Sequence, residues 1–291
     1  MSADGFSGGP PPGAAADWTI AQGWNGYTTE EHSTWLTLYD RQMAVLPGRA
    51  CNAFLHGLDA LDLRGEGVPD FTRISERLQA LTGWSVVAVP GLIPDDVFFD
   101  HLASRRFPAG NFIRKPHELD YLKEPDVFHD VFGHVPMLTD PVFADYMAAY
   151  GRGGARALQL GRLHNLARLY WYTVEFGLMQ SAAGLRIYGA GIVSSRTESV
   201  FSLEDGSPNR IAFDLQRVMR TPYRIDDFQQ TYFVIPSMDE LLDVTQHDFG
   251  ALYTALAGAK DIAITDLAPG DRVITRGHQE YAASRAPAQL V

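Results

Sequence analysis

Apolar residues recur at helical intervals in three separate stretches of the chain. TTEEHSTWLTLYDRQMAVL, at 28–46, places large apolar side chains on one side of a helix behind an acidic first turn. FTRISERLQALTG, at 71–83, repeats the pattern and ends at a glycine, where helices commonly stop. PDDVFFDHLASRRF, at 94–107, opens with a proline and two aspartates, which suit a first helical turn. Each stretch is predicted to be a helix.

The remaining pattern mixes helix and strand. WSVVAVPG, at 84–91, is a β-rich apolar run, whereas 107–123 is aromatic at first, interrupted by proline and glycine, and predicted to be irregular. Helices are predicted at 141–151 and at 163–180, the second apolar nearly all round and therefore expected in the core. From residue 185 onward short strands and helices follow one another without regular alternation. The pattern favours a mainly α (α+β) fold with a few short strands.

The domain organisation predicted from this pattern is simple. Residues 1–17 form a disordered tail, residues 18–250 form one main domain, and residues 251–291 form a C-terminal extension of uncertain structure that packs on the domain or trails from it. We find no internal repeat. The C-terminal part has no heptad run for a coiled coil, so a monomer is expected.

Charge and cysteine content exclude several classes of function. The 291 residues carry a formal net charge of -11 and a pI near 5.2, which argues against a nucleic-acid footprint or a polybasic membrane face. Cys51 is the single cysteine, so the chain alone can build no disulfide, Cys-rich zinc site or iron–sulfur cluster. The N-terminal stretch has the pattern of neither a signal peptide nor a membrane span. A small-molecule activity in the cytoplasm is expected.

Two histidines stand five residues apart in VFHDVFGHVP. On a straight α-helix, His129 and His134 would point in directions roughly 140° apart, so they would not form a helical metal pair. Gly133 could end the helix and Pro136 would prevent its resumption, which would let His134 swing back toward His129. The alternative is that both are hydrogen-bonded core histidines. The sequence therefore predicts a metal site that straddles a helix end.

Glu175, within LYWYTVEFGLM, adds a third candidate ligand. A carboxylate in this apolar setting is costly to bury unless it binds a cation or pairs with an arginine. Two histidines and one glutamate form the ligand set of non-haem Fe(II) oxygenases, which leaves three coordination positions open. A zinc hydrolase with Asp130 as base, or a non-enzymatic binding protein, could use the same residues. Iron is favoured because the motif has no built-in general base such as the Glu of H-E-x-x-H.

Three motifs in order carry a family resemblance. EPDVFHDVFGHVP (124–136), ARLYWYTVEFGL (167–178) and YGAGIVSS (188–195) resemble the tetrahydropterin-dependent aromatic amino acid hydroxylases. The similarity extends from about residue 30 to residue 237, and is greatest to the short, single-domain bacterial members that hydroxylate phenylalanine. The resemblance implies a helical-basket catalytic domain. The GAG segment is by itself a weak match to a dinucleotide-binding motif and lacks the strand–helix context that such a motif needs, so no dinucleotide binding is expected.

The family resemblance also assigns residues to a site. It implies that His129, His134 and Glu175 bind one Fe(II) and that no other residue is catalytic. The implied substrate-binding residues are Arg114, Trp171, Gly191 and Ser194. Among them, Arg114 would bind the carboxylate of the amino acid as a bidentate fork. The implied pterin-binding residues, with Phe98 stacking on the ring, are Gly91, Leu92, Ile93, Phe98, Asp130, Ala167 and Tyr170.

The implied reaction converts L-phenylalanine and O2 to L-tyrosine, with Fe(II) and tetrahydrobiopterin or a related reduced pterin as cofactors. Two departures from the animal members affect the implied specificity: Asp130 replaces a common Glu, and Pro108 stands where a His is common. Tryptophan hydroxylation is therefore the alternative within the family. Trp171 argues against it, because tryptophan hydroxylases usually carry Phe at this position.

Overall fold

The computed structural model describes residues 9–120, 124–285 and 290–291, and the chain divides into two compact units. The first unit comprises residues 1–47 and 52–159, and the second comprises 48–51 and 160–291. These limits differ from the predicted domain boundaries at residues 17 and 250, which stay predictions. Within the described part of the chain, no helix is both long enough and apolar enough to span a membrane.

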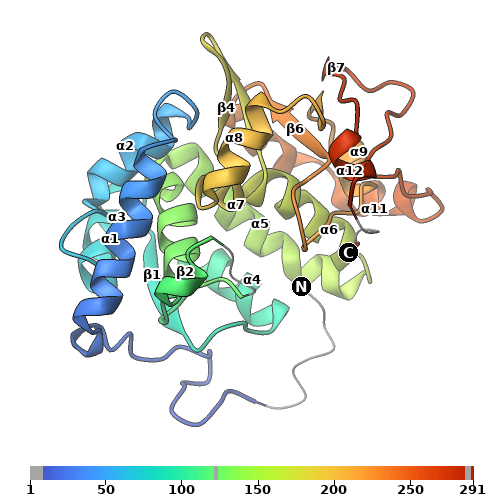
Figure 1. Cartoon of the computed structure of the whole chain (residues 1–291). Helices are drawn as coiled ribbons and strands as arrows, with labels where there is room; N and C mark the ends of the chain where they lie inside the picture. Colours follow the sequence, from blue (N-terminus) through green and yellow to red (C-terminus); the bar gives the residue numbers. More distant parts are fainter. Residues whose placement is uncertain (1–8, 121–123, 286–289) are drawn as a thin grey trace. The chain divides into compact units, whose positions relative to one another are not determined.

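The first unit is mainly helical (Figure 1). Its α-helices are α1 (Thr29–Met43), α2 (Asn52–Leu61), α3 (Phe71–Leu81), α4 (Asp95–Ala103) and α5 (Pro141–Gln159). Thr28 caps α1 in a capping box: its hydroxyl accepts the Glu31 N–H, and the Glu31 carboxylate accepts the Thr28 N–H. The helices predicted at 28–46 and 71–83 are confirmed, and the one predicted at 94–107 is confirmed as far as Ala103, after which Arg106 begins a strand.

A two-stranded parallel sheet lies in the same unit. The predicted strand at 84–91 is confirmed as β1 (Ser85–Val89), which pairs with β2 (Arg106–Gly110). The prediction of irregular chain from 107 was therefore wrong for its first residues, while 121–123 lie outside the described residues. Pro108 disguised the strand, because proline cannot donate a ladder hydrogen bond and is tolerated only where a strand has an edge.

Helix α5 continues well past its predicted end at residue 151. Its glycines permit close packing rather than ending the helix: a Cβ on Gly154 would lie 2.0 Å from the Phe99 ring, and one on Gly151 would lie 2.4 Å from the Ala103 nitrogen. Both contacts are with α4. The glycines thus let α5 approach the helix that carries Phe98.

The second unit contains a five-stranded sheet with the order β4-β3-β6-β5-β7. Its strands are β3 (Leu178–Ser181), β4 (Gly184–Ile187), β5 (Asn209–Ala212), β6 (Thr231–Ile235) and β7 (Val273–Thr275). Its α-helices are α6 (Leu163–Tyr170), α7 (Ala190–Val193), α8 (Arg196–Glu204), α9 (Leu215–Met219), α10 (Met238–Asp243), α11 (Phe249–Leu256) and α12 (Glu280–Ala283). The mixture of short strands and helices predicted after residue 185 is confirmed, as is the mainly helical fold class.

The predicted helix at 163–180 is confirmed as far as Glu175 and wrong beyond it. α6 ends at Tyr170, a π-helix, η6 (Trp171–Glu175), follows, and β3 begins at Leu178. The apolar composition could not reveal the change, because apolar residues continue across it as far as Met179. A Cβ on Gly177 would lie 2.1 Å from the Tyr188 ring, so this glycine allows the chain to turn tightly against the start of the next motif.

Both ends of the chain make ordered contacts where they are described. Asp17, in the predicted disordered tail, accepts hydrogen bonds from the Thr19 hydroxyl and from Arg106. In the predicted extension, β7 pairs antiparallel with β5, and Tyr281 of α12 donates to Asp227 at 2.7 Å. Residues 1–8 and 286–289 lie outside the described residues. The described part of the extension therefore belongs to the second unit.

Candidate active site

The two histidines lie on a π-helix, η4 (Phe128–His134). A π-helix closes i→i+5 hydrogen bonds, so its turn is wider than that of an α-helix and residues five apart lie on one side. The rings of His129 and His134 are 5.2 Å apart between centroids and cross at 82°. The predicted break at Gly133 is therefore wrong: the helix widens instead of ending, and His134 is its last residue.

Aromatic packing holds this widened helix in the first unit. The Phe128 and Phe132 rings stack on each other at 4.6 Å. Phe128 also packs against Trp35 of α1, and Phe132 against Phe54 of α2, at 5.2 and 5.7 Å. Both phenylalanines are fully buried. The two phenylalanines alternate with the two histidines along η4. Burial of the phenylalanine side therefore directs both imidazoles to the opposite side of the helix.

Glu175 is the last residue of the second π-helix, η6. The Phe176 N–H donates to the Trp171 carbonyl at 2.8 Å, an i→i+5 hydrogen bond. Within the second unit, a Cβ on Gly189 would lie 2.4 Å from the Glu175 carbonyl oxygen, and one on Gly191 would lie 3.1 Å from it. The glycines of YGAGIVSS thus let α7 and its N-cap pack against the Glu175 backbone.

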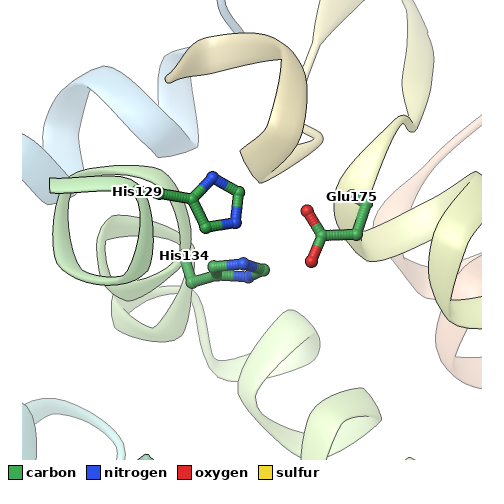
Figure 2. Close-up of side chains that lie close together, drawn as sticks. All are labelled: His129, His134 and Glu175. Atoms are coloured by element: carbon green, nitrogen blue, oxygen red, sulfur yellow. The ribbon is translucent and has the colours of Figure 1, made fainter. Parts of the chain in front are cut away.

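The three predicted ligands form a group suited to a metal ion. One candidate ligand atom from each of His129, His134 and Glu175 lies within 4.8 Å of the others. Figure 2 shows the two imidazoles and the carboxylate facing one another. Among the described residues no other group of three such side chains has this geometry. Two nitrogen donors and one oxygen donor form the ligand set of a mononuclear non-haem iron site.

Arg114, the predicted carboxylate clamp, is buried and already holds a carboxylate. Its Nε and Nη2 donate to the two oxygens of Asp126, each at 2.9 Å. Asp126 is fully buried and also accepts the His129 N–H at 3.0 Å. Burial raises the pKa of Asp126, but the hydrogen bonds and charge of Arg114 outweigh it and hold that pKa below its ordinary value. Asp126 thus orients the arginine and the first histidine together.

The predicted substrate residues of the second unit lie around η6. Trp171 stacks on Tyr223 at 4.2 Å and 15°, and contacts Phe176 at 4.9 Å. A Cβ on Gly191 would lie 2.8 Å from the Phe176 ring, so α7 approaches the same aromatic cluster. The Ser194 hydroxyl, at the end of α7, donates to the Ala190 carbonyl at 2.7 Å.

Comparison with known proteins identifies the family. The family model for biopterin-dependent aromatic amino acid hydroxylases matches residues 24–251. The chain belongs to this family. It is 73% identical over 282 residues to a phenylalanine-4-hydroxylase of Caulobacter vibrioides, covering 97% of this chain and 96% of that protein. It is 58% identical over 266 residues to a phenylalanine-4-hydroxylase of Chromobacterium violaceum, covering 91% and 90% of the two chains.

A solved structure supports the same relationship. The iron- and phenylalanine-bound crystal structure of the Chromobacterium violaceum phenylalanine hydroxylase superposes on this hydroxylase with a TM-score of 0.86 and 58% identity. The superposition covers 89% of this chain and 95% of that one. The mainly helical hydroxylase fold inferred from the sequence is therefore confirmed.

The segments predicted to bind pterin lie in both units of this hydroxylase. In the first, Gly91 has a φ of 138° and opens the irregular stretch before α4; Leu92 is exposed, and Ile93 and Phe98 are half-buried. Asp130 accepts the Gly110 N–H at 2.8 Å, which ties η4 to the end of β2. In the second unit, the other two predicted residues, Ala167 and Tyr170, are buried on α6.

Two residues that adjoin the predicted site were missed by the sequence interpretation. Asp126 stands within the recognised motif EPDVFHDVFGHVP, three residues before His129, and an acid directly before a buried apolar run could have signalled a buried partner for a cation. Tyr223 lies in TPYRIDD, and nothing in that local pattern predicts its stacking on Trp171. The contact depends on tertiary structure alone.

Proposed function

We propose that this hydroxylase is a phenylalanine 4-monooxygenase that converts L-phenylalanine to L-tyrosine with O2 and a reduced pterin. The observation that carries the proposal is the 73% identity to a phenylalanine-4-hydroxylase across 97% of the chain. The converging histidines and glutamate support it, because they match the chemistry that such an enzyme needs. Tryptophan hydroxylation and zinc-dependent hydrolysis are not favoured.

His129, His134 and Glu175 would hold one Fe(II) and leave three positions for water, O2 or substrate. Bound iron and pterin would together supply the activated oxygen that becomes bonded to the para carbon of the phenylalanine ring. The donor set suits iron, since neutral imidazoles and one carboxylate keep the site cationic and partly open. Asp126 holds the His129 backbone and thereby limits the positions its imidazole can take.

Arg114 would bind the carboxylate of the amino acid. Asp126 uses two of the five N–H donors of the guanidinium, and the remaining three can form a second, charge-assisted fork. Because Asp126 is buried and bidentate, the arginine is oriented before the substrate arrives, which reduces the entropy cost of binding. This is a role that lysine could not fill.

The aromatic cluster of the second unit would orient the substrate ring. Trp171 is held flat by Tyr223, so its position is defined by packing rather than by flexible side-chain torsions. Gly191 and Ser194 would line the amino-acid site. The pterin would stack on Phe98, beside the backbone from Gly91 to Ile93, with Asp130, Ala167 and Tyr170 completing its site.

The proposal extends to the state and location of the protein. We propose a monomer that acts in the cytoplasm. A single cysteine, Cys51, which is buried, is consistent with a reducing compartment. Gel filtration with light scattering tests the first point, and fractionation of cells that express the native gene tests the second.

One incubation tests the activity. The purified protein is mixed with ferrous iron, tetrahydrobiopterin, O2 and, in separate reactions, phenylalanine, tryptophan or tyrosine, and the products are separated by chromatography. We expect tyrosine from phenylalanine, with a requirement for both iron and pterin. Faster formation of hydroxytryptophan would overturn the substrate assignment. Hydrolytic activity with zinc and no need for pterin would overturn the reaction class.

A further inference from the structure

The π-helix that carries Glu175 rests on one turn of the second unit, residues 219–223. The Tyr172 hydroxyl donates to the Pro222 carbonyl at 2.6 Å, and Tyr223 stacks on Trp171. Just before the π-helix, the Asn165 side-chain amide donates to the Met219 carbonyl at 2.9 Å. The position of α6 and η6 therefore depends on where this turn is held.

This turn is held in place by residues of the C-terminal extension. They lie beyond the segment that matches the family model, which ends at residue 251. The Ile262 N–H donates to the Arg220 carbonyl at 2.8 Å, and Arg220 Nη2 donates to the Lys260 carbonyl at 2.8 Å. Tyr223 and Val291 exchange backbone hydrogen bonds of 2.9 and 3.2 Å. Two parts of the C-terminal extension thus fasten the turn.

Asp261 reaches past the turn to the helix itself. Its two carboxylate oxygens accept hydrogen bonds from Arg168 Nη1 and Nη2 at 2.7 and 2.9 Å. The Arg168 side chain is 7% exposed, whereas that of Asp261 is 54% exposed. In the described structure Arg168 Nε is buried without a hydrogen-bond partner, and Nη1 has only a long contact of 3.4 Å with the Met219 carbonyl besides Asp261. Asp261 is the main partner that neutralises this buried guanidinium.

Arg168 is well placed to transmit a displacement to the site. It precedes Trp171 by three residues, so the two side chains lie on one side of the helical segment. Glu175 ends the same segment. If the Arg168 end moves, the Trp171 ring slides on Tyr223 and the carboxylate of Glu175 is carried with the helix.

We propose that Asp261 is a positioning residue for hydroxylation: through Arg168 it sets the orientation of Trp171 and Glu175. The inference rests on the proposed function, because it needs those two residues to face the substrate and the iron. Asp261 itself touches neither. A small misplacement of the ring would let oxygen be activated without reaching the para carbon, so pterin would be oxidised without formation of tyrosine.

The test compares two variants that each neutralise one half-exposed carboxylate paired with an arginine. Asp261→Asn removes the partner of Arg168, and Glu204→Gln removes the partner of Arg49, at the far end of α8, with a carboxylate exposure of 53%. Tyrosine formed and tetrahydrobiopterin oxidised are measured well below the melting temperature. We expect Asp261→Asn to lower the ratio of tyrosine to oxidised pterin roughly threefold or more, since a misplacement of about 1 Å can cost about 100-fold in rate. Glu204→Gln should leave the ratio unchanged.

Two further variants separate positioning from general stability. Asp261→Glu, which keeps the charge, should restore most of the coupling, and Asp261→Asn should add nothing when combined with Arg168→Gln. A normal ratio in Asp261→Asn, with only a lower melting temperature, would overturn the proposal. Failure of the unchanged protein to make tyrosine would instead overturn the proposed function. This activity is measured before any variant is compared.

Discussion

At the scale of single residues, two buried acids, Asp126 and Glu198, differ in how their carboxylates are compensated. Asp126 is fully buried, yet it accepts hydrogen bonds from Arg114 and from the His129 backbone, so its charge is compensated on each oxygen. Glu198, on α8, is also buried, but the groups that donate hydrogen bonds to its carboxylate in the described structure are neutral: the Tyr232 hydroxyl at 2.7 Å and the Gln229 N–H at 3.2 Å. The two acids should therefore respond to substitution in opposite ways.

Neutralising Asp126 should destabilise the protein strongly. Asp126→Asn leaves the guanidinium of Arg114 buried beside an uncharged group, and we expect the free energy of unfolding to fall by about 3 kcal/mol. The control is Asp40→Asn, which breaks an ion pair with Arg64 whose side chains are both more than half exposed, and which should change stability by less than about 1 kcal/mol. Urea unfolding of both variants measures the difference. Equal losses would contradict the assigned role of Asp126.

Neutralising Glu198 should change how stability depends on pH. Burial raises the pKa of Glu198 from 4.5 to about 7. As the pH rises above 4.5 the unfolded chain loses this proton while the folded chain keeps it, so the free energy of unfolding falls until about pH 7, by roughly 3 kcal/mol. Glu198→Gln should remove that decline. Urea unfolding at pH 5 and pH 8 tests this, and the same decline in both proteins would refute it.

At the scale of elements, the site is built from two π-helices that end in ligands. His134 ends η4 and Glu175 ends η6. Such wide turns have poorer internal packing than α-helices, so they persist only where their surroundings hold them. η4 is held by its stacked phenylalanines, and η6 by the glycines of the following motif, which allow α7 to pack against its last residue.

Filling the space beside η6 should disturb the metal ligand. Gly189→Ala places a methyl group 2.4 Å from both the Glu175 carbonyl and the Gly177 nitrogen, neither of which can move alone. We expect a loss of about 1–3 kcal/mol in the free energy of unfolding and weaker iron binding. Gly153→Ala, in α5 with nothing within 4 Å of its new methyl group, should be neutral or stabilising by up to about 1 kcal/mol. Calorimetry and iron titration of the pair measure both effects; unchanged iron binding in Gly189→Ala would count against this packing role.

At the scale of the whole molecule, the ligands come from parts of the sequence that are far apart. A metal that binds all three can bind only the folded chain tightly, so it should stabilise the fold as a whole. The family's fold supplies the frame, while the net charge of -11 affects solubility and partner choice rather than this site.

Iron should therefore raise the melting temperature. Ferrous iron at 100 times its dissociation constant stabilises the folded state by about 2.7 kcal/mol, and a chelator should reverse the shift. Glu175→Gln should lose most of the shift and all hydroxylation, whereas Glu204→Gln should keep both. Scanning calorimetry under anaerobic conditions, with and without iron, makes the measurement. A full shift in Glu175→Gln would remove Glu175 from the ligand set.

The sequence by itself determined the helices at 28–46 and 71–83, most of the helix predicted at 94–107, the first strand, the residues proposed as ligands and the family. These features depend on local periodicity, on capping residues or on chemically rare residues in apolar surroundings. All three can be recognised in the amino-acid sequence itself. The expectation of no nucleic-acid or membrane partner likewise came from composition alone.

Only the tertiary structure decided how the five-residue spacing of His129 and His134 works. The geometry of a straight α-helix led to the prediction that the helix ends at Gly133. Packing of Phe128 and Phe132 against other helices instead stabilises a wider helical turn that local propensity does not encode. The same holds for the strand hidden by Pro108, for the partnership of Asp126 with Arg114, and for the reach of Asp261 to Arg168. Each depends on a neighbour distant in sequence, and the energy of such contacts appears only once the chain has folded.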